Sequence, residues 1–267
     1  MLIESIILGI IQGVAEWLPI SSEGLITLIS INFFQKDLLT SIDIALFLHI
    51  GTFFAALIYF RKDVKNLIIA ALKPKSAGKE HKKIFVFLIV STIITGIIGL
   101  GILNTFLNVE WFLEKTSNAI TALIGFFLII TAVLQFKKPE RGFKKSEDIK
   151  LADSAILGIA QGFAIIPGLS RSGLTIASLL FRGFQDSEAL RLNFLMSLPA
   201  VLGGNIFFQF SGISSLDILN PYLLFSALIA FAAGLVSIHI LIIISKKINF
   251  GWFALFFGLL TLIAVFI

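Results

Sequence analysis

Six apolar stretches, each about as long as a membrane-spanning helix, constrain the fold of this chain more than any other feature of its sequence. A helix needs about 20 residues to cross the hydrocarbon core of a bilayer. Only 14% of the residues are charged and 57% are hydrophobic, whereas about 25% of the residues of soluble domains are charged. The sequence therefore predicts an all-α polytopic membrane protein that forms one membrane domain over residues 1–267. The predicted spans are 42–60, 84–103, 119–136, 189–210, 222–245 and 250–267.

The distribution of Lys and Arg predicts which side of the membrane each loop faces. Cytoplasmic loops of membrane proteins carry an excess of these residues. We therefore expect the three basic loops to be cytoplasmic, and the two loops with few basic residues to be external. The basic loops are 61–83, 137–150 and the pair Lys246 and Lys247, and the other two are 104–118 and 211–221.

Two further segments, 1–40 and 151–187, cannot cross the membrane in this topology, because each must begin and end on the same side. We predict that they are re-entrant helical hairpins, broken at Pro19 and Pro167. One hairpin and three spans then make up each half of the chain. This arrangement predicts an inverted-topology repeat, with repeat 1 at about 1–136 and repeat 2 at about 151–267.

The centres of the two hairpins have related sequences. Adding 149 to the residue number superposes Gly9, Gln12, Gly13, Ala15, Ser21 and Gly24 on Gly158, Gln161, Gly162, Ala164, Ser170 and Gly173. The copies differ at two chemically important positions, where Glu16 corresponds to Ile165 and Ser22 to Arg171. Broken helices free backbone N–H groups and expose a positive helix end, and both favour an anion. We therefore expect the hairpin tips to form a phosphate-sized polar pocket.

Glu16, Arg171 and the serines are the candidates for chemistry in this pocket. Ionisable groups inside a membrane are costly and are functional candidates by default. The guanidinium of Arg171 suits bidentate binding of a phosphate. The alternative for Glu16 and Arg171 is an ion pair that only holds the hairpins together. Ser21 and Ser22 are candidate hydroxyls, and their alternative role is to cap the second half-helix.

Sequence alone assigns no single role in the chemistry to four further polar residues. Gln12 and its repeat partner Gln161 are expected to satisfy backbone groups rather than to bind substrate. Glu23 is either a general base or a carboxylate that the helix dipole favours in a first turn. His49 is either a proton-transfer group or a hydrogen-bonded packing residue.

The polar residues of the two hairpins belong to two long motifs. The first motif comprises Gln12, Gly13, Glu16, Pro19, Ser21, Ser22 and Gly24, and the second comprises Pro167, Gly168, Ser170, Arg171, Ser172, Gly173 and Thr175. With these motifs the chain resembles the undecaprenyl-pyrophosphate phosphatase family, also called the bacitracin-resistance family. The resemblance implies a membrane enzyme that removes the terminal phosphate from a polyprenyl diphosphate and so recycles the lipid carrier of cell-envelope glycans. It also implies a divalent cation, Mg²⁺ or Ca²⁺.

One residue departs from the family pattern. The family usually has a histidine just after the first motif, and this chain has Leu25 there. A mechanism that needs this histidine cannot operate here, so either activity is lost or the remaining groups carry it.

The sequence thus predicts a multi-pass phosphatase of the cell membrane whose site opens to the external face. Ser22 is the expected nucleophile, activated by Glu16 or Glu23, and a metal-activated water is the alternative. Glu16 is also the expected metal ligand. No nucleic-acid partner is expected, and a homodimer is left open. The other class of function is a transporter or flippase of a polyprenyl phosphate or another anion. The catalytic candidates are Glu16, Ser22 and Arg171, and the substrate-binding candidates are Ser21, Gly168, Ser170, Ser172 and Thr175.

Overall fold

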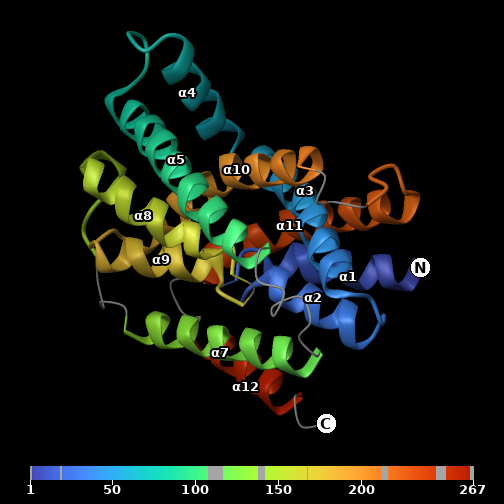
Figure 1. Cartoon of the computed structure of the whole chain (residues 1–267). Coiled ribbons are helices and arrows are strands. Elements are labelled where there is room, and N and C mark those ends of the chain that lie inside the picture. The colour runs from blue at the N-terminus through green and yellow to red at the C-terminus, as the bar shows by residue number, and fades with distance from the viewer. Residues whose placement is uncertain are drawn as a thin grey trace.

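The computed structural model consists of helices joined by short irregular segments in the part of the chain that it describes (Figure 1). That part comprises residues 2–18, 20–107, 117–137, 142–166, 168–211, 216–244 and 251–264. Within it, 4 helices are long and apolar enough to cross a membrane. The chain is therefore an all-α polytopic membrane protein, as predicted. These helices are α3 (Leu38–Tyr59), α5 (Lys79–Leu107), α10 (Asp186–Phe210) and α11 (Pro221–Ile244).

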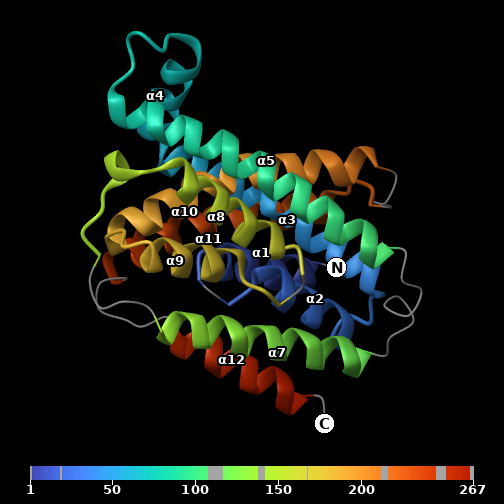
Figure 2. The same ribbon diagram turned by 60° about the vertical axis from the view of Figure 1, so that its left-hand side comes forward.

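Two shorter apolar helices occupy the other two predicted spans. They are α7 (Ser117–Phe136) and α12 (Gly251–Ala264). The two lie side by side and form a separate layer against the rest of the bundle (Figures 1 and 2). Residue 250 and residues 265–267 of the last predicted span lie outside the described residues.

Each predicted hairpin consists of two half-helices separated by a short irregular segment. The first pair is α1 (Leu2–Ala15) and α2 (Ser22–Asn32), and the second is α8 (Leu151–Phe163) and α9 (Arg171–Phe181). The helix breaks therefore fall where the sequence predicts them, although Pro19 and Pro167 themselves lie outside the described residues. Ser21 (φ 56°) and Gly168 (φ 96°) have left-handed backbones. Both residues reverse the chain just before the second half-helix.

The first half-helices pack in matching ways on the two halves of the chain. A Cβ on Gly9 would lie 2.5 Å from the carbonyl oxygen of Ser226 on α11, and a Cβ on Gly158 would lie 2.7 Å from that of Ser91 on α5. A Cβ cannot approach a backbone oxygen so closely, so both contacts require glycine. Each hairpin thus packs on a span of the other half. These contacts support the proposed repeats, and the opposite orientation of the halves in a membrane stays a prediction.

The basic segment 61–83 is not the simple loop that we expected. Residues Arg61–Leu72 form the helix α4, which projects from the bundle beside α5 (Figure 1). Val64 and Leu67 of this helix pack against the main apolar core. Counting basic residues missed this helix, because α4 carries charges on one face and apolar side chains on the other.

Helices α4, α5 and α10 are joined by an ion-pair cluster. Arg191 of α10 pairs with Asp63 of α4 at 2.5 Å and with Glu80 of α5 at 2.8 Å. A short 3₁₀ helix, η1 (Ser146–Asp148), lies in the second basic segment, where Ser146 donates to Glu188. These contacts hold α4, α5 and α10 together far from the hairpin tips.

Candidate active site

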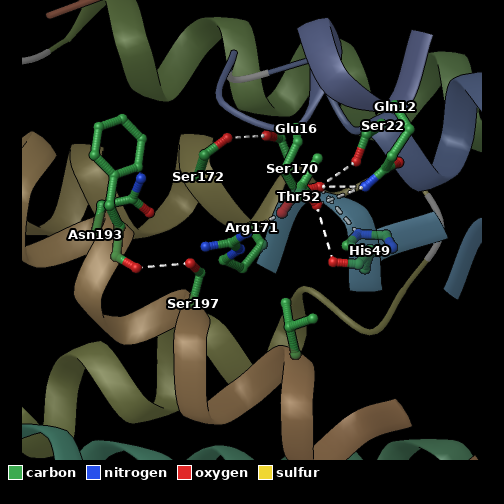
Figure 3. Close-up of polar contacts among 12 residues, drawn as sticks. Gln12, Glu16, Ser22, His49, Thr52, Ser170, Arg171, Ser172, Asn193 and Ser197 are labelled. Atoms are coloured by element: carbon green, nitrogen blue, oxygen red, sulfur yellow. Dashed lines mark hydrogen bonds and ion pairs between the residues drawn. The ribbon is translucent and has the colours of Figure 1, made fainter. Parts of the chain in front are cut away.

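The tips of the two hairpins meet inside the bundle (Figure 3). The hydroxyl of Ser172 in α9 donates to the backbone carbonyl of Leu18 in the first tip, at 2.7 Å. Arg171 forms an ion pair with Glu16 across the same interface. Glu16 and Arg171 are 155 residues apart in sequence, and the fold brings the polar residues of the two motifs into one cluster.

Glu16 is the centre of this cluster. Its carboxylate is buried, with 4% of the residue exposed. Atom Oε2 accepts from the hydroxyl of Ser22 at 2.7 Å and from the side-chain amide of Gln12 at 3.1 Å. Nε2 of His49 lies 3.0 Å from the same oxygen, while Arg171 pairs with Oε1. Both oxygens of the carboxylate are therefore engaged, and Ser22 is placed to transfer its proton to Glu16.

His49 lies beside the carboxyl group of Glu16. Its Nδ1 lies 2.6 Å from the carbonyl oxygen of Ala45, and its Nε2 faces Glu16. A carbonyl only accepts hydrogen bonds, and a neutral imidazole has a single N–H. When Nδ1 donates to Ala45, the contact between Nε2 and Glu16 requires one more proton, held by the imidazole or by the carboxyl group. Arg171 supplies positive charge on the other oxygen of Glu16.

The N-terminal ends of α2 and α9 border the site. Ser21 and Ser170 are the capping residues, and their hydroxyls accept from the N–H groups of Gly24 at 3.2 Å and Gly173 at 3.1 Å. The capping role that we considered for Ser21 is confirmed. Ser22 and Arg171 are the first residues of their helices. Two helix N-termini, each favourable to an anion, are thus presented to the same space.

The polar residues surround a small pocket of about 30 Å³. It has room for about one water molecule, so it is smaller than the phosphate-sized pocket that we predicted. It adjoins an apolar cavity of about 420 Å³, and both are lined by Glu23, His49, Ala164 and Arg171. The small pocket is therefore continuous with the larger cavity through these shared residues. The small pocket is lined by Glu16, Leu18, Ser21, Ser22, Glu23, His49, Ala164, Leu169, Ser170, Arg171 and Ser172.

Two predicted substrate-binding residues lie beside the pocket rather than on its wall. The hydroxyl of Thr175 is 2.8 Å from the carbonyl oxygen of Arg171 and 2.6 Å from Oδ1 of Asn193. Gly168 lies against Ile124 of α7. In this position both residues orient the start of α9. Direct contact of either with substrate stays a prediction.

The glutamines differ from our expectation. The side-chain amide of Gln12 donates to the carboxylate of Glu16 and also, at 3.3 Å, to the hydroxyl of Thr52. The side-chain amide of Gln161 donates to the hydroxyl of Thr95 at 3.1 Å. The prediction that these amides bind backbone groups is therefore wrong. Sequence reasoning also missed Thr52, although this residue follows His49 by one helical turn and so had to lie near it.

Comparisons with known proteins agree with the geometry. The family described as "Bacitracin resistance protein BacA" matches residues 5–263. The chain belongs to this family. It is 43% identical over 267 residues to a protein of Methanococcoides burtonii named undecaprenyl-diphosphatase, covering 99% of this chain and 98% of the relative. A protein of the same name from Syntrophotalea carbinolica is 32% identical over 95% of this chain and 94% of the relative. The resemblance inferred from the two motifs is thus confirmed.

Leu25, which replaces the expected histidine of this family, lies away from the polar pocket. Its side chain packs against an apolar cluster formed by Ala15, Ile20, Ala132 and Ala254. It is not among the residues that line the pocket. In this arrangement the substitution removes no group from the pocket, and Glu16, Glu23 and His49 remain to move protons.

We expect Leu25→His to lower the thermal stability of the protein without raising its rate of phosphate release. An imidazole among apolar side chains lacks a hydrogen-bond partner, which typically costs about 1–3 kcal/mol. Thermal unfolding in detergent and a phosphate-release assay measure the two effects. Leu25→Met is the control, because it nearly conserves volume. A higher rate in Leu25→His would mean that position 25 reaches the reacting phosphate.

The carboxylates of the pocket are suited to a divalent cation. Mg²⁺ and Ca²⁺ prefer oxygen ligands, and Mg²⁺ is usually held by one or two carboxylates together with substrate phosphates. Glu23 lines both cavities and has no hydrogen-bond or ion-pair partner among the described residues. Among the described residues, no group of three or more His, Cys, Asp or Glu side chains could hold a metal ion without further ligands. Glu23 thus has no competing partner in this part of the chain, whereas both oxygens of Glu16, our predicted metal ligand, are engaged, and metal binding by Glu16 stays a prediction.

Proposed function

We propose that this protein is an integral-membrane phosphatase that hydrolyses an undecaprenyl-type diphosphate to the monophosphate and inorganic phosphate. The observation that carries the proposal is the hydrogen bond between Ser22 and Glu16, placed beside Arg171 at the inner end of an apolar cavity. A lipid diphosphate has both the charged head and the apolar chain that such a site would accept. The names of the relatives support the same reaction, and its lipid product would be reused as a carrier.

The diphosphate would bind between the N-termini of α2 and α9. Arg171 uses Nη2 for Glu16, whereas its Nη1 is buried and has no hydrogen-bond partner among the described residues. A phosphate oxygen would satisfy this nitrogen. Ser21, Ser170 and Ser172 line the same pocket and would position the remaining oxygens. The prenyl chain would occupy the larger cavity.

Ser22 would attack the terminal phosphorus. Its proton would pass to Oε2 of Glu16, 2.7 Å away, and the phosphorus–oxygen bond to the polyprenyl phosphate would break, leaving the electron pair on that product. Glu16 would give this proton to the departing phosphate oxygen and become a carboxylate again. It would then deprotonate the water that attacks the phosphoserine, and the bond between phosphorus and Ser22 would break, with Ser22 taking the proton back from Glu16. The alternative is direct attack by water in a single step. Arg171 would stabilise the negative charge of the transferring group in both cases.

A divalent cation would be held by Glu23, with Glu16 as a second carboxylate. When bound, such an ion neutralises negative charge on phosphate oxygens. This proposal fits the lack of a partner for Glu23 in the described part of the chain, and it explains a carboxylate beside an anion-binding pocket. We further propose that the protein lies in the cell membrane with its site open to the external face. A homodimer is left open.

The test is phosphate release from a polyprenyl diphosphate by the purified protein, with Mg²⁺ and with a chelator. We expect release with Mg²⁺ and a fall to background with the chelator, because the charge of the diphosphate is then not neutralised. The substrate should also be tested in vesicles, with lipid movement followed in parallel. Movement of the lipid between leaflets without release of phosphate would contradict the proposal and favour the transporter.

A further inference from the structure

The apolar cavity is bounded by α3, α5, α8 and α10. Its volume of about 420 Å³ is in the range of sites that hold a drug-sized ligand, about 300–1,000 Å³. A long polyprenyl chain therefore does not fit inside it as a whole. If the diphosphate lies in the polar pocket, the chain must leave the protein somewhere along the cavity wall.

Two facing walls of the cavity contain glycines that nothing packs against. These are Gly96 on α5 and Gly203 and Gly204 on α10. A Cβ at any of them would meet no atom within 4 Å, and none has a left-handed backbone. Glycine inside a helix costs roughly 0.5–1 kcal/mol relative to alanine. Neither close packing nor backbone geometry requires glycine at these positions, in contrast to Gly158. Their structural effect is to leave the wall open.

The same walls reach the outer surface of the bundle. Leu100 follows Gly96 by one helical turn and is 44% exposed, and Phe207 follows Gly203 by one turn and is 38% exposed. Both side chains also line the cavity. Because α5 and α10 are long enough to span the membrane, the surface between them would face lipid in a bilayer. An opening of the cavity at this surface would lead sideways into the hydrocarbon.

The inner end of the cavity has buried polar atoms without partners. Oε1 of Gln161 and Nη1 of Arg171 have no hydrogen-bond partner in the described part of the chain, and both residues line the cavity. Only 4% of Gln161 is exposed. Unsatisfied buried groups are costly, so they indicate a ligand with polar atoms at this end. A ligand that is polar at this end and apolar toward α5 and α10 is an amphiphile.

We propose that Gly96, Gly203 and Gly204 form a lateral passage through which the polyprenyl chain of the bound lipid leaves the protein between α5 and α10. The passage makes turnover depend on chain length, since a long chain needs it and a short chain ends within the cavity. This inference rests on the proposed function, because it takes the lipid diphosphate as the occupant. The continuity of the cavity with the pocket around Glu16 supports that occupant.

The first experiment blocks the passage with leucine. Leucine favours helix more than glycine does, so Gly96→Leu and Gly203→Leu preserve the spans. The measured quantity is the ratio of kcat/KM for a long-chain polyprenyl diphosphate to kcat/KM for a short prenyl diphosphate. We expect this ratio to fall by about tenfold or more, as for other steric discrimination in apolar pockets. An unchanged ratio in both variants would overturn the proposal.

Gly101→Leu is the matched control. Gly101 lies on α5 and also has no atom within 4 Å of a built Cβ, but it does not line the cavity. We expect this variant to keep the ratio of the unmodified protein. An equal fall of the ratio in Gly101→Leu would mean that bulk on α5, rather than the passage, causes the effect.

The second experiment does not depend on catalysis. The chain contains no cysteine, so Gly203→Cys and Gly101→Cys each introduce a single thiol. A polyprenyl monophosphate should slow methanethiosulfonate labelling at position 203 and not at position 101. Equal labelling with and without the lipid at position 203 would overturn the passage. Protection at position 203 in a protein that releases no phosphate from either substrate would instead overturn the proposed function and keep the passage.

Discussion

Glu16→Gln is expected to reduce phosphate release from a polyprenyl diphosphate by about 10²–10⁴-fold, the usual range for a general base. A glutamine amide cannot accept the proton of Ser22, which lies 2.7 Å from Oε2. Ser22→Ala is expected to have an effect of similar size. The double variant should be little slower than either single one, because the two groups act as a unit. Initial rates of phosphate release in detergent measure all three.

Two controls separate this effect from general damage to the first hairpin. Glu4 lies on α1, the helix that ends just before Glu16, but pairs with Lys36 at 3.0 Å. Ser30 lies on α2 with Ser22, is buried, and its hydroxyl has no partner among the described residues. Glu4→Gln and Ser30→Ala should keep most activity. If Ser22→Ala remained active while Glu16→Gln did not, water would be the nucleophile. Full activity in both Glu16→Gln and Ser22→Ala would mean that the active site lies elsewhere in the protein.

Arg171→Lys is expected to lower kcat/KM by about 10²–10³-fold, as the loss of one donor to a developing oxyanion does. Arginine can pair with Glu16 through Nη2 and bind phosphate through Nη1. Lysine has a single side-chain nitrogen, which cannot occupy both positions at once. Steady-state kinetics of phosphate release test this expectation, and thermal unfolding reports whether the fold is kept.

Arg182→Lys is the matched control for this substitution. Arg182 is the residue that ends α9 and pairs with Asp153 at 2.6 Å. Its ion pair lies away from the pocket, so the lysine variant should keep most activity. Near-normal turnover in Arg171→Lys would contradict the account and would leave Arg171 as a structural ion pair that joins the hairpins.

The cluster of Glu16, Ser22 and Arg171 could be predicted because its signals are local in sequence. A carboxylate and hydroxyls within an apolar segment indicate a broken helix, and the second copy with Arg171 indicates where its partner lies. The helix breaks, the caps and the contact between Glu16 and Arg171 all follow from these features.

Other features depend on which face of a helix meets which neighbour, and a single sequence does not specify that. Leu25 is close to Ser22 in sequence, yet it packs against Ala132 and Ala254 rather than toward the pocket. Asn193 and Thr52 come from spans that we treated as apolar. The small volume of the pocket results from the side-chain pairs within it, so it could not be derived from the spacing of the motifs.

The most direct test of the central claim is an experimental structure of the protein with a non-hydrolysable polyprenyl diphosphonate. The account predicts that the diphosphonate lies between the N-termini of α2 and α9, within hydrogen-bond distance of Arg171, with the terminal phosphorus facing Ser22. It also predicts that the chain leaves between α5 and α10, past Gly203. The account would be contradicted if the diphosphonate bound elsewhere in the protein, with Glu16 and Arg171 still paired and the polar pocket beside them empty.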